Sequence, residues 1–278
     1  MLPRPLLPSS LRAVAAACLL ALPAALLSPA LARDGVDVGN NSAFSRLVPA
    51  ENVERSAGQQ YAQLLQKAAE QRALAPATHP QVLRLRAIAQ KIIPHALAWN
   101  PRAKDWKWEV NLIGSKQINA FCMPGGKIAF YTGILDQLQL TDDEVAMVMG
   151  HEIAHALREH ARERMGKSAA TNIGANVLAQ VLGAGAIGQQ LIGGGAQLLT
   201  LKFSREDETE ADLVGMELGA RAGYNPRAGI TLWQKMANAN KGAPPQWMST
   251  HPSGSTRIAE MERNLPRVQP LYEQARRG

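Results

Sequence analysis

The chain has 278 residues, of which 46% are hydrophobic and 19% charged, and its formal net charge is +7 at pH 7. This length suits one large domain or two smaller ones. The positive charges are spread along the sequence and only 5% of the residues are aromatic, so the composition gives little support to nucleic-acid binding. The net charge is compatible with contact with an anionic envelope surface.

The first 32 residues have the features of a secretory signal peptide. Basic residues precede an apolar run at residues 13–27, and residues 30–32 form an Ala-Leu-Ala cleavage site. We therefore predict a signal peptide at residues 1–32 and an exported mature chain. An uncleaved anchor is the alternative, although the run is short for a membrane span. Lipidation at Cys18 is disfavoured because no leucine stands in the three residues before it.

Cleavage would leave Cys122 as the sole cysteine of the mature chain, so no intramolecular disulfide could form. Residues 33–53 are polar and lack periodicity, and we expect a flexible leader there. The remainder, residues 54–278, is expected to form a single domain. Its stability must then come from its core or from a metal.

The first half of this domain shows alternating helix and strand patterns. Apolar residues at helical spacing predict helices over residues 54–74 and 80–98. An alternating stretch at residues 106–113 predicts a strand. Residues 119–133 contain Pro-Gly-Gly at 124–126, which predicts a turn between two short strands. The two histidines near the second helix, His79 and His95, are expected to be surface or capping residues.

The next helix carries the pattern His151-Glu152-Ile153-Ala154-His155, which matches the H-E-x-x-H zinc motif. Residues i and i+4 share one helical face, so both imidazoles can reach one metal ion. Glu152 can accept a proton from water held by that metal. A capping box formed by Thr141 and Glu144 predicts the start of this helix, and its end is expected near Gly166.

His160 follows His155 by five residues and is therefore expected to point away from the ligand face, as a structural or surface residue. Beyond it, residues 173–201 contain no charged side chain. We expect two small-residue helices joined by glycine-rich turns and packed against the motif helix. A membrane-dipping or partner-binding hairpin, giving peripheral membrane contact through residues 173–201, is the alternative.

A zinc hydrolase of this type needs a third protein ligand. The segment at residues 204–212 offers several acids, and a solvated acidic first turn of a helix would also explain them. Spacing singles out Glu208 and Asp212, which are four residues apart on one face. Glu208 can complete a His-His-Glu site, and Asp212 can accept a hydrogen bond from a ligand histidine. Further helices are expected over residues 226–240 and 255–264.

The combination resembles peptidase family M48, which includes the HtpX-like and CAAX-prenyl-protease-like gluzincins. The resemblance covers residues 54–266 and rests on motifs that occur in a fixed order. These motifs are Asn119-Ala120-Phe121 with Pro124-Gly125-Gly126, the motif at 151–155, Glu208-Thr209-Glu210-Ala211-Asp212, and Thr250-His251-Pro252 with Arg257.

The resemblance implies an α+β, mainly helical, zincin-type fold with a small sheet beside the motif helix. It implies one zinc ion per chain, with Glu208 as the third ligand and Asp212 as an orienting partner. The strand with Asn119, Ala120 and Phe121 would be the edge against which an extended substrate pairs.

The resemblance also places His251 near the zinc, where it would either stabilise an oxyanion or cap the open position of the metal in a resting state. Arg257 would brace this loop or contact acidic groups of the site. Unlike HtpX and the prenyl proteases, the sequence lacks transmembrane helices, and it also lacks tetratricopeptide repeats. It therefore resembles a soluble periplasmic branch, and recruitment through such repeats to outer-membrane assembly machinery is not expected.

The expected function is a zinc-dependent endopeptidase that hydrolyses extended, unfolded or misassembled envelope polypeptides. An alternative from another class is a chaperone-like client-binding or assembly factor in which zinc is mainly structural. A membrane-interacting scaffold built on residues 173–201 is a third hypothesis.

Overall fold

The structure is a computed structural model that describes residues 34–181, 198–239, 246–252 and 255–277. The predicted signal peptide and most of the uncharged glycine-rich stretch fall outside these residues, so neither prediction is tested. Within the described part of the chain, no helix is both long and apolar enough to cross a membrane.

The N-terminal part differs from the predicted flexible leader at residues 33–53. Val36 is buried in the main core, and its backbone N–H donates a hydrogen bond to the Glu217 carboxylate at 2.9 Å. A short 3-10 helix, η1, spans Ala43–Leu47, and the first helix, α1, spans Ala50–Glu70. The leader prediction is wrong because single apolar residues pack against distant helices, a contact that leaves no periodicity in the local sequence.

The second predicted helix is divided in the structure. Helix α2 spans Pro80–Ile92, and the 3-10 helix η2 spans Ile93–Ala98. Pro94 has no N–H to donate within an α-helix, which explains the change of helix type. The His79 side chain accepts a hydrogen bond from the Gln81 N–H and caps α2, as predicted. A further 3-10 helix, η3, spans Pro101–Lys104.

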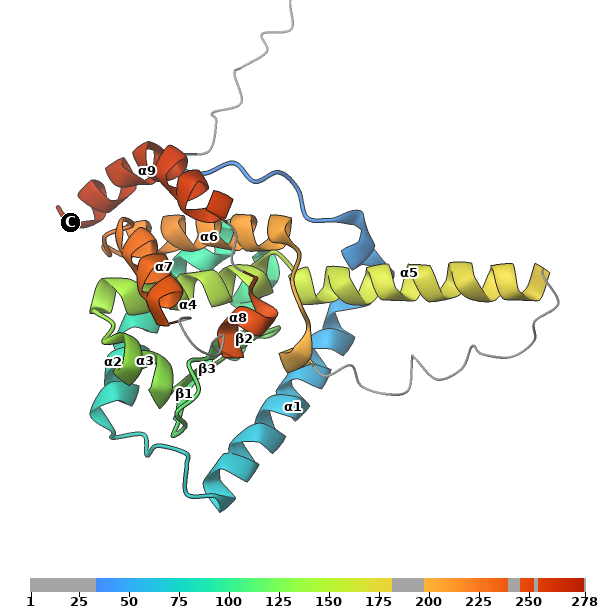
Figure 1. Ribbon diagram of the computed structural model, residues 1–278, viewed down its shortest axis with the longest axis horizontal. Helices are drawn as coiled ribbons and strands as arrows, with labels where there is room; N and C mark the ends of the chain where they lie inside the picture. The colour runs from blue at the N-terminus through green and yellow to red at the C-terminus, as the bar shows by residue number, and fades with distance from the viewer. Residues whose placement is uncertain (1–33, 182–197, 240–245, 253–254, 278) are drawn as a thin grey trace, which may run out of the picture. The chain divides into compact units, whose positions relative to one another are not determined.

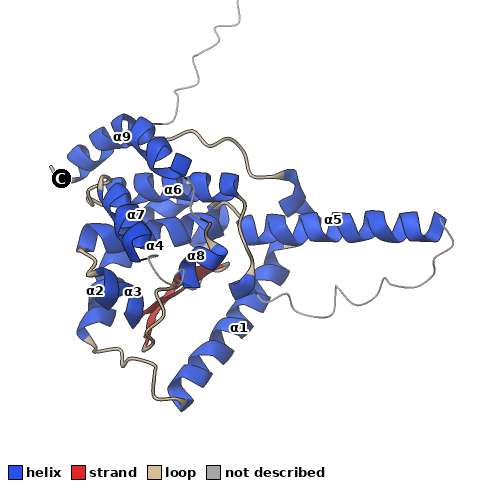
Figure 2. Ribbon diagram, viewed as in Figure 1, coloured by secondary structure: helices blue, strands red, loops and turns tan. Residues whose placement is uncertain are grey.

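A small sheet follows, with the strands β1 (Glu109–Ile113), β2 (Ala120–Met123) and β3 (Lys127–Tyr131) in the order β1-β3-β2. Figure 2 shows these strands in red among the helices. Strands β2 and β3 form the predicted antiparallel hairpin, whereas β1 runs parallel to β3. The turn places Gly126 at φ 76°, where a Cβ would lie 2.7 Å from the Trp108 ring. In the order β1-β3-β2, strand β2 lies at one edge of the sheet.

The motif helix, α4, spans Asp142–Leu157 and follows α3 (Thr132–Leu138). The predicted capping box at its start is present: Thr141 accepts from the Glu144 N–H and Glu144 accepts from the Thr141 N–H. Figure 1 shows α4 between the sheet and α6 (Arg205–Arg221), with α9 (Ser255–Ala275) on the far side of α6.

The backbones of α4 and α6 cross at two glycines. A Cβ on Gly150 would lie 2.7 Å from the Gly215 carbonyl oxygen, and one on Gly215 would lie 2.6 Å from the His151 nitrogen. Only residues without a side chain permit so close an approach. This crossing fixes the distance between the motif histidines and the acidic residues of α6.

The prediction that the motif helix continues to Gly166 is wrong. Helix α4 ends at Leu157, Glu159 adopts a left-handed conformation with φ 59°, and a new helix, α5, spans His160–Val181. Neither glycine nor proline marks this break, so helical periodicity could not reveal it. The break changes the direction in which His160 points.

The remaining elements complete the helical side of the domain. They are the 3-10 helix η4 (Leu198–Thr200) and the helices α7 (Ala228–Ala239) and α8 (Gln246–Thr250). Helix α9 runs beyond the predicted end at residue 264, through Pro266 and Pro270, because the buried Leu265, Val268 and Leu271 hold it against the core.

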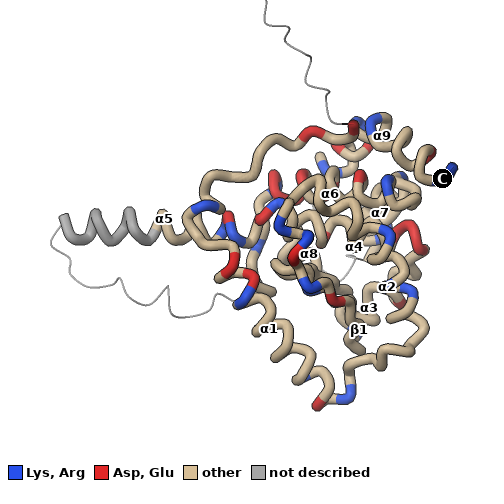
Figure 3. Tube along the Cα trace, turned by 180° about the vertical axis from the view of Figure 1, so that it is seen from behind, with Lys and Arg blue, Asp and Glu red and all other residues tan. Residues whose placement is uncertain are grey.

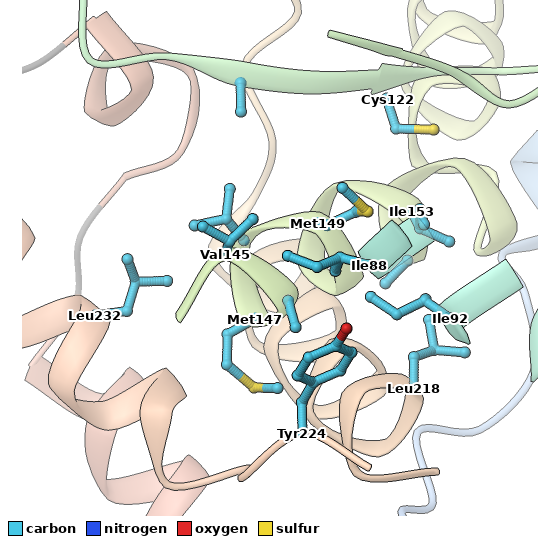
Figure 4. Close-up of a cluster of buried hydrophobic side chains, with 14 of the residues drawn as sticks. Ile88, Ile92, Cys122, Val145, Met147, Met149, Ile153, Leu218, Tyr224 and Leu232 are labelled. Carbon is cyan, nitrogen blue, oxygen red and sulfur yellow. The ribbon is translucent and has the colours of Figure 1, made fainter. Parts of the chain in front are cut away.

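The main core lies where α2, α4 and α6 meet beside the sheet. Figure 4 shows Ile88 and Ile92 of α2 beside Met149 and Ile153 of α4, with Leu218 of α6 in the same cluster. Basic and acidic residues are both spread over the described chain (Figure 3), although acidic residues occur together in the first turns of α4 and α6. The predicted fold class, mainly helical with a small sheet beside the motif helix, is confirmed.

Candidate metal centre

The two motif histidines lie one turn apart on α4, as their spacing predicts. Both are 3% exposed, and their Nε2 atoms are 3.1 Å apart. Burial lowers the pKa of each imidazole, so both side chains are neutral near pH 7. Neutral imidazoles whose Nε2 atoms converge are typical metal ligands.

Helix α6 brings Glu208 to the same point. This residue is fully buried; its Oε2 lies 3.6 Å from Nε2 of His151, and its Oε1 lies 3.4 Å from Nε2 of His155. His251, at the end of α8, joins them, and potential ligand atoms of all four residues lie within 4.8 Å of one another. The other acids at 204–212 that the sequence left open are not part of this cluster.

Several buried polar atoms of the cluster have no hydrogen-bond partner within the described chain. These atoms are Oε1 and Oε2 of Glu208 and Nε2 of His251. Arg257 Nη1 lies 2.7 Å from Glu208 as an ion pair, but its orientation does not satisfy hydrogen-bond geometry. Burial raises the pKa of Glu208 to about 9, so its charged form needs a further cation nearby.

This donor set fits a zinc ion. Two imidazole nitrogens and one carboxylate are the ligands of catalytic zinc sites. Bonds of ~2.0–2.1 Å in a tetrahedral arrangement place ligand atoms about 3.3 Å apart, close to the 3.1–3.6 Å separations found among His151, His155 and Glu208.

Asp212 orients His151, as its spacing from Glu208 predicts. Its Oδ1 lies 3.0 Å from Nδ1 of His151, and the Arg257 guanidinium donates to both carboxylate oxygens at 2.6 and 2.7 Å. Burial opposes ionisation of Asp212, but Arg257 and the His151 hydrogen bond outweigh it and hold the pKa of Asp212 at about 2. The charged Asp212 must accept the hydrogen bond, which leaves Nε2 of His151 free to bind a metal.

Glu152 lies beside this cluster and is 2% exposed. The Trp247 indole donates a hydrogen bond to its Oε1 at 2.6 Å, and Nε2 of His251 lies 3.6 Å from the same oxygen. Burial raises the pKa of Glu152 to about 8. A carboxylate with such a pKa can both accept and return a proton near neutral pH.

A cavity opens from this cluster toward the edge strand β2. Its lining includes Asn119, Ala120 and Phe121, the predicted substrate-binding residues, together with Glu152 and His155. The other walls are largely apolar and include Met123, Leu198, Leu199, Leu201 and Phe203. The structure thus brings the predicted strand and the predicted catalytic residues to one cavity.

Sequence reasoning missed two aromatic residues of the site. Trp247 is fully buried and stacks between Trp233 and His251, with ring centroids 5.2 and 4.9 Å away. Phe203 stacks on His155 at 4.0 Å. Neither residue has a spacing relation to the zinc motif, so only the tertiary structure reveals their positions.

Sequence reasoning also placed His160 wrongly. The side chain is 1% exposed, and its Nδ1 lies 2.8 Å from Nδ1 of His155, so it does not point away from the ligand helix face. The break at Glu159 turns the start of α5 back toward α4 and produces this contact.

Comparison with known proteins gives one matching family. Residues 83–265 match the family described as Peptidase family M48. The mitochondrial metalloendopeptidase OMA1 of Saccharomyces cerevisiae is 34% identical over 217 residues, which cover 74% of this chain and 62% of the yeast protein.

Two bacterial relatives also match. The metalloprotease LoiP of Escherichia coli is 31% identical over 66% of this chain and 70% of its own length. The beta-barrel assembly-enhancing protease of Yersinia pestis is 28% identical over 57% of this chain and 35% of its own length. The chain spans about half the length of the first OMA1 relatives that it matches.

Proposed function

The chain belongs to peptidase family M48, and on that basis we propose that it is a zinc-dependent endopeptidase acting on extended segments of unfolded or misassembled envelope proteins. The observation that carries this proposal is the buried cluster of His151, His155 and Glu208, with the Glu152 carboxylate beside it. The relatives whose names describe an activity are metalloendopeptidases or proteases.

Zinc is the cofactor of this family, and His151, His155 and Glu208 are the residues that would hold it. When bound, zinc acts as a Lewis acid that polarises the scissile carbonyl and makes water a better nucleophile at neutral pH. Asp212, braced by Arg257, keeps His151 in the tautomer that this role requires.

Glu152 acts as the general base. It accepts a proton from the attacking water and returns that proton to the leaving amine, as its pKa of about 8 allows. The Trp247 indole occupies one of its oxygens and so fixes the direction of the carboxylate. Trp247 is thereby a positioning residue for the proton transfer.

His251 caps the centre in the resting state. Its Nε2 has no hydrogen-bond partner in the described chain and belongs to the same group of converging ligand atoms. Nδ1 is occupied by the Trp247 carbonyl at 3.1 Å and by Thr250 at 2.9 Å. Substrate entry would displace Nε2 of His251 from this position. Because the Trp247 carbonyl holds the ring proton on Nδ1, Nε2 can donate to an oxyanion only after the imidazole takes up a second proton.

The substrate is an extended polypeptide. Residues 119–121 lead into an edge strand whose backbone can pair with an added strand, and the cavity beside them has apolar walls. Apolar segments exposed by unfolding would fit this environment. Backbone pairing does not depend on side-chain identity, so it suits misfolded polypeptides that have no sequence in common.

We place the protein in the periplasm because residues 1–32 have the pattern of a signal peptide. The name of the Yersinia pestis relative describes enhancement of beta-barrel assembly, which supports a role in the envelope. The OMA1 relatives are mitochondrial, so this placement is tested separately from the activity.

Digestion of an unfolded protein such as casein tests the activity. We expect cleavage that a chelator abolishes and that zinc, but not magnesium, restores. Cleavage that continues after complete removal of the metal would contradict the proposal. For the envelope role, cells that carry Glu152→Gln should accumulate envelope polypeptides that cells with the wild-type protein degrade; identical polypeptide profiles would exclude that role.

One observation favours the chaperone-like alternative with structural zinc. A fourth ligand closes a zinc site, as in structural centres, and His251 stands in that position. The variant His251→Ala separates the two functions. A capped enzyme keeps its zinc and cleaves casein faster or slower than the wild type, whereas a structural site loses zinc affinity without gaining activity.

A further inference from the structure

We propose that His160 is a positioning residue for His155, and that Glu210 and Arg158 hold His160 in the required orientation. The inference rests on the proposed function, because it assumes that Nε2 of His155 binds zinc. It gives the second histidine of the motif an orienting partner comparable to the Asp212 that orients the first.

The contact is direct and buried. Nδ1 of His160 lies 2.8 Å from Nδ1 of His155, the rings are inclined at 75°, and each side chain is at most 3% exposed. His160 is the first residue of α5, so the left-handed turn at Glu159 is what directs its ring toward α4.

Two nitrogens at this distance require one donor and one acceptor. If Nε2 of His155 binds zinc through its lone pair, Nδ1 of His155 must carry the ring proton and donate it to Nδ1 of His160. A neutral His160 then carries its own proton on Nε2. Zinc binding by His155 therefore specifies the tautomer of both histidines.

The environment of His160 matches this tautomer. Its Nε2 lies 3.4 Å from Oε2 of Glu210, a carboxylate that can only accept when ionised. This Nε2 is buried and has no partner of good hydrogen-bond geometry within the described chain, so its contact with Glu210 is an ionic approach and not a hydrogen bond. The proton on Nε2 thus faces a negative charge.

Arg158 fixes the Glu210 carboxylate. Its Nε forms a close ion pair with Oε1 of Glu210, and its Nη2 donates to the Gly39 carbonyl at 2.9 Å. The Arg158 side chain is only 5% exposed, which protects the pair from solvent screening. An arginine also holds the carboxylate of Asp212, which contacts His151 directly, whereas the Glu210 carboxylate reaches His155 only through His160.

Zinc affinity of the purified protein, measured by competition with a chromogenic chelator, tests the proposal. Removing an orienting partner weakens metal binding by roughly 10- to 100-fold, and we expect that loss for His160→Leu. In His160→Asn the amide oxygen can accept from Nδ1 of His155, so its affinity should stay within about threefold of the wild type. Unchanged affinity in His160→Leu, or equal losses in both variants, would overturn the proposal.

A second pair of variants covers the case in which His160→Leu does not fold. Glu210→Gln should weaken zinc binding, whereas Glu206→Gln, one turn earlier on an exposed site of α6, should not. Equal affinities of these two variants would also contradict the proposal. Failure of the wild-type protein to bind zinc would instead overturn the proposed function itself, so the two failures are distinguishable.

Discussion

The α4–α6 pair and the short helix α8 supply different parts of the same centre. The helix pair provides His151, His155 and Glu208 from backbones in direct contact at two glycines. The five-residue helix α8 provides Trp247, and His251 is the residue directly after its end. We infer that the closely packed pair sets the metal geometry, while α8 orients the general base and His251 after it controls access.

The largest effect is expected from removing the ligand that α6 supplies. Glu208→Ala leaves two histidines, so bound zinc per chain should fall from one to near zero, and proteolysis should fall with it. Elemental analysis of the purified protein measures the zinc. The control is Glu206→Ala on the exposed side of the same helix turn, which should keep its zinc.

If Glu208→Ala retained zinc at the wild-type level, another acid would be the ligand. The claim that the α4–α6 pair, with Glu208 as its third ligand, sets the metal geometry would then be wrong.

A smaller effect is expected from disturbing the helix contact itself. In Gly215→Ala the new Cβ would lie 2.6 Å from the His151 nitrogen, so the helices must move apart. Such overpacking costs about 1–3 kcal/mol. We expect a fall of several degrees in the melting temperature together with weaker zinc binding.

The matched control for this variant is Gly58→Ala, on α1, where nothing lies within 4 Å of the new Cβ. It should raise the stability by about 0.5–1 kcal/mol, because alanine favours helix more than glycine. Zinc affinity of Gly215→Ala equal to that of the wild type would show that the crossing does not determine the metal geometry.

The smallest effect should come from α8. Trp247→Phe keeps an aromatic ring between Trp233 and His251 but removes the indole N–H that donates to Glu152. We expect kcat to fall about tenfold, equivalent to ~1.4 kcal/mol, with zinc content unchanged. A loss of zinc in this variant would contradict the division of roles between α8 and the helix pair.

The parts that could be predicted from the sequence depend on local geometry. The spacing of His151 and His155 and the capping box at Thr141 are properties of one helix, and both reappear in the structure. Glu208 and Asp212 were singled out because residues four apart share a helix face. Their closeness to the histidines could not be derived in this way, since it depends on the crossing of α4 and α6.

The parts that escaped prediction depend on long-range contacts or on unmarked breaks. The Val36 N–H donates to Glu217, 181 residues away, and the local pattern of residues 33–53 gives no sign of this contact. The turn at Glu159 contains no glycine or proline, so the sequence gives no sign of it. Without this turn, helical spacing predicts that His160 points away from His155, whereas the structure brings the two rings into contact. Trp247 has no fixed spacing from the H-E-x-x-H motif in the sequence, although it donates a hydrogen bond to Glu152 in the structure.

The central claim is that this centre binds zinc and that Glu152 transfers the proton. The most direct measurement compares the zinc content and casein cleavage of Glu152→Gln with those of the wild type. We predict one zinc per chain in both proteins and a loss of about 10²- to 10⁴-fold in kcat for the variant. Near-normal cleavage by a zinc-loaded Glu152→Gln protein would contradict the account.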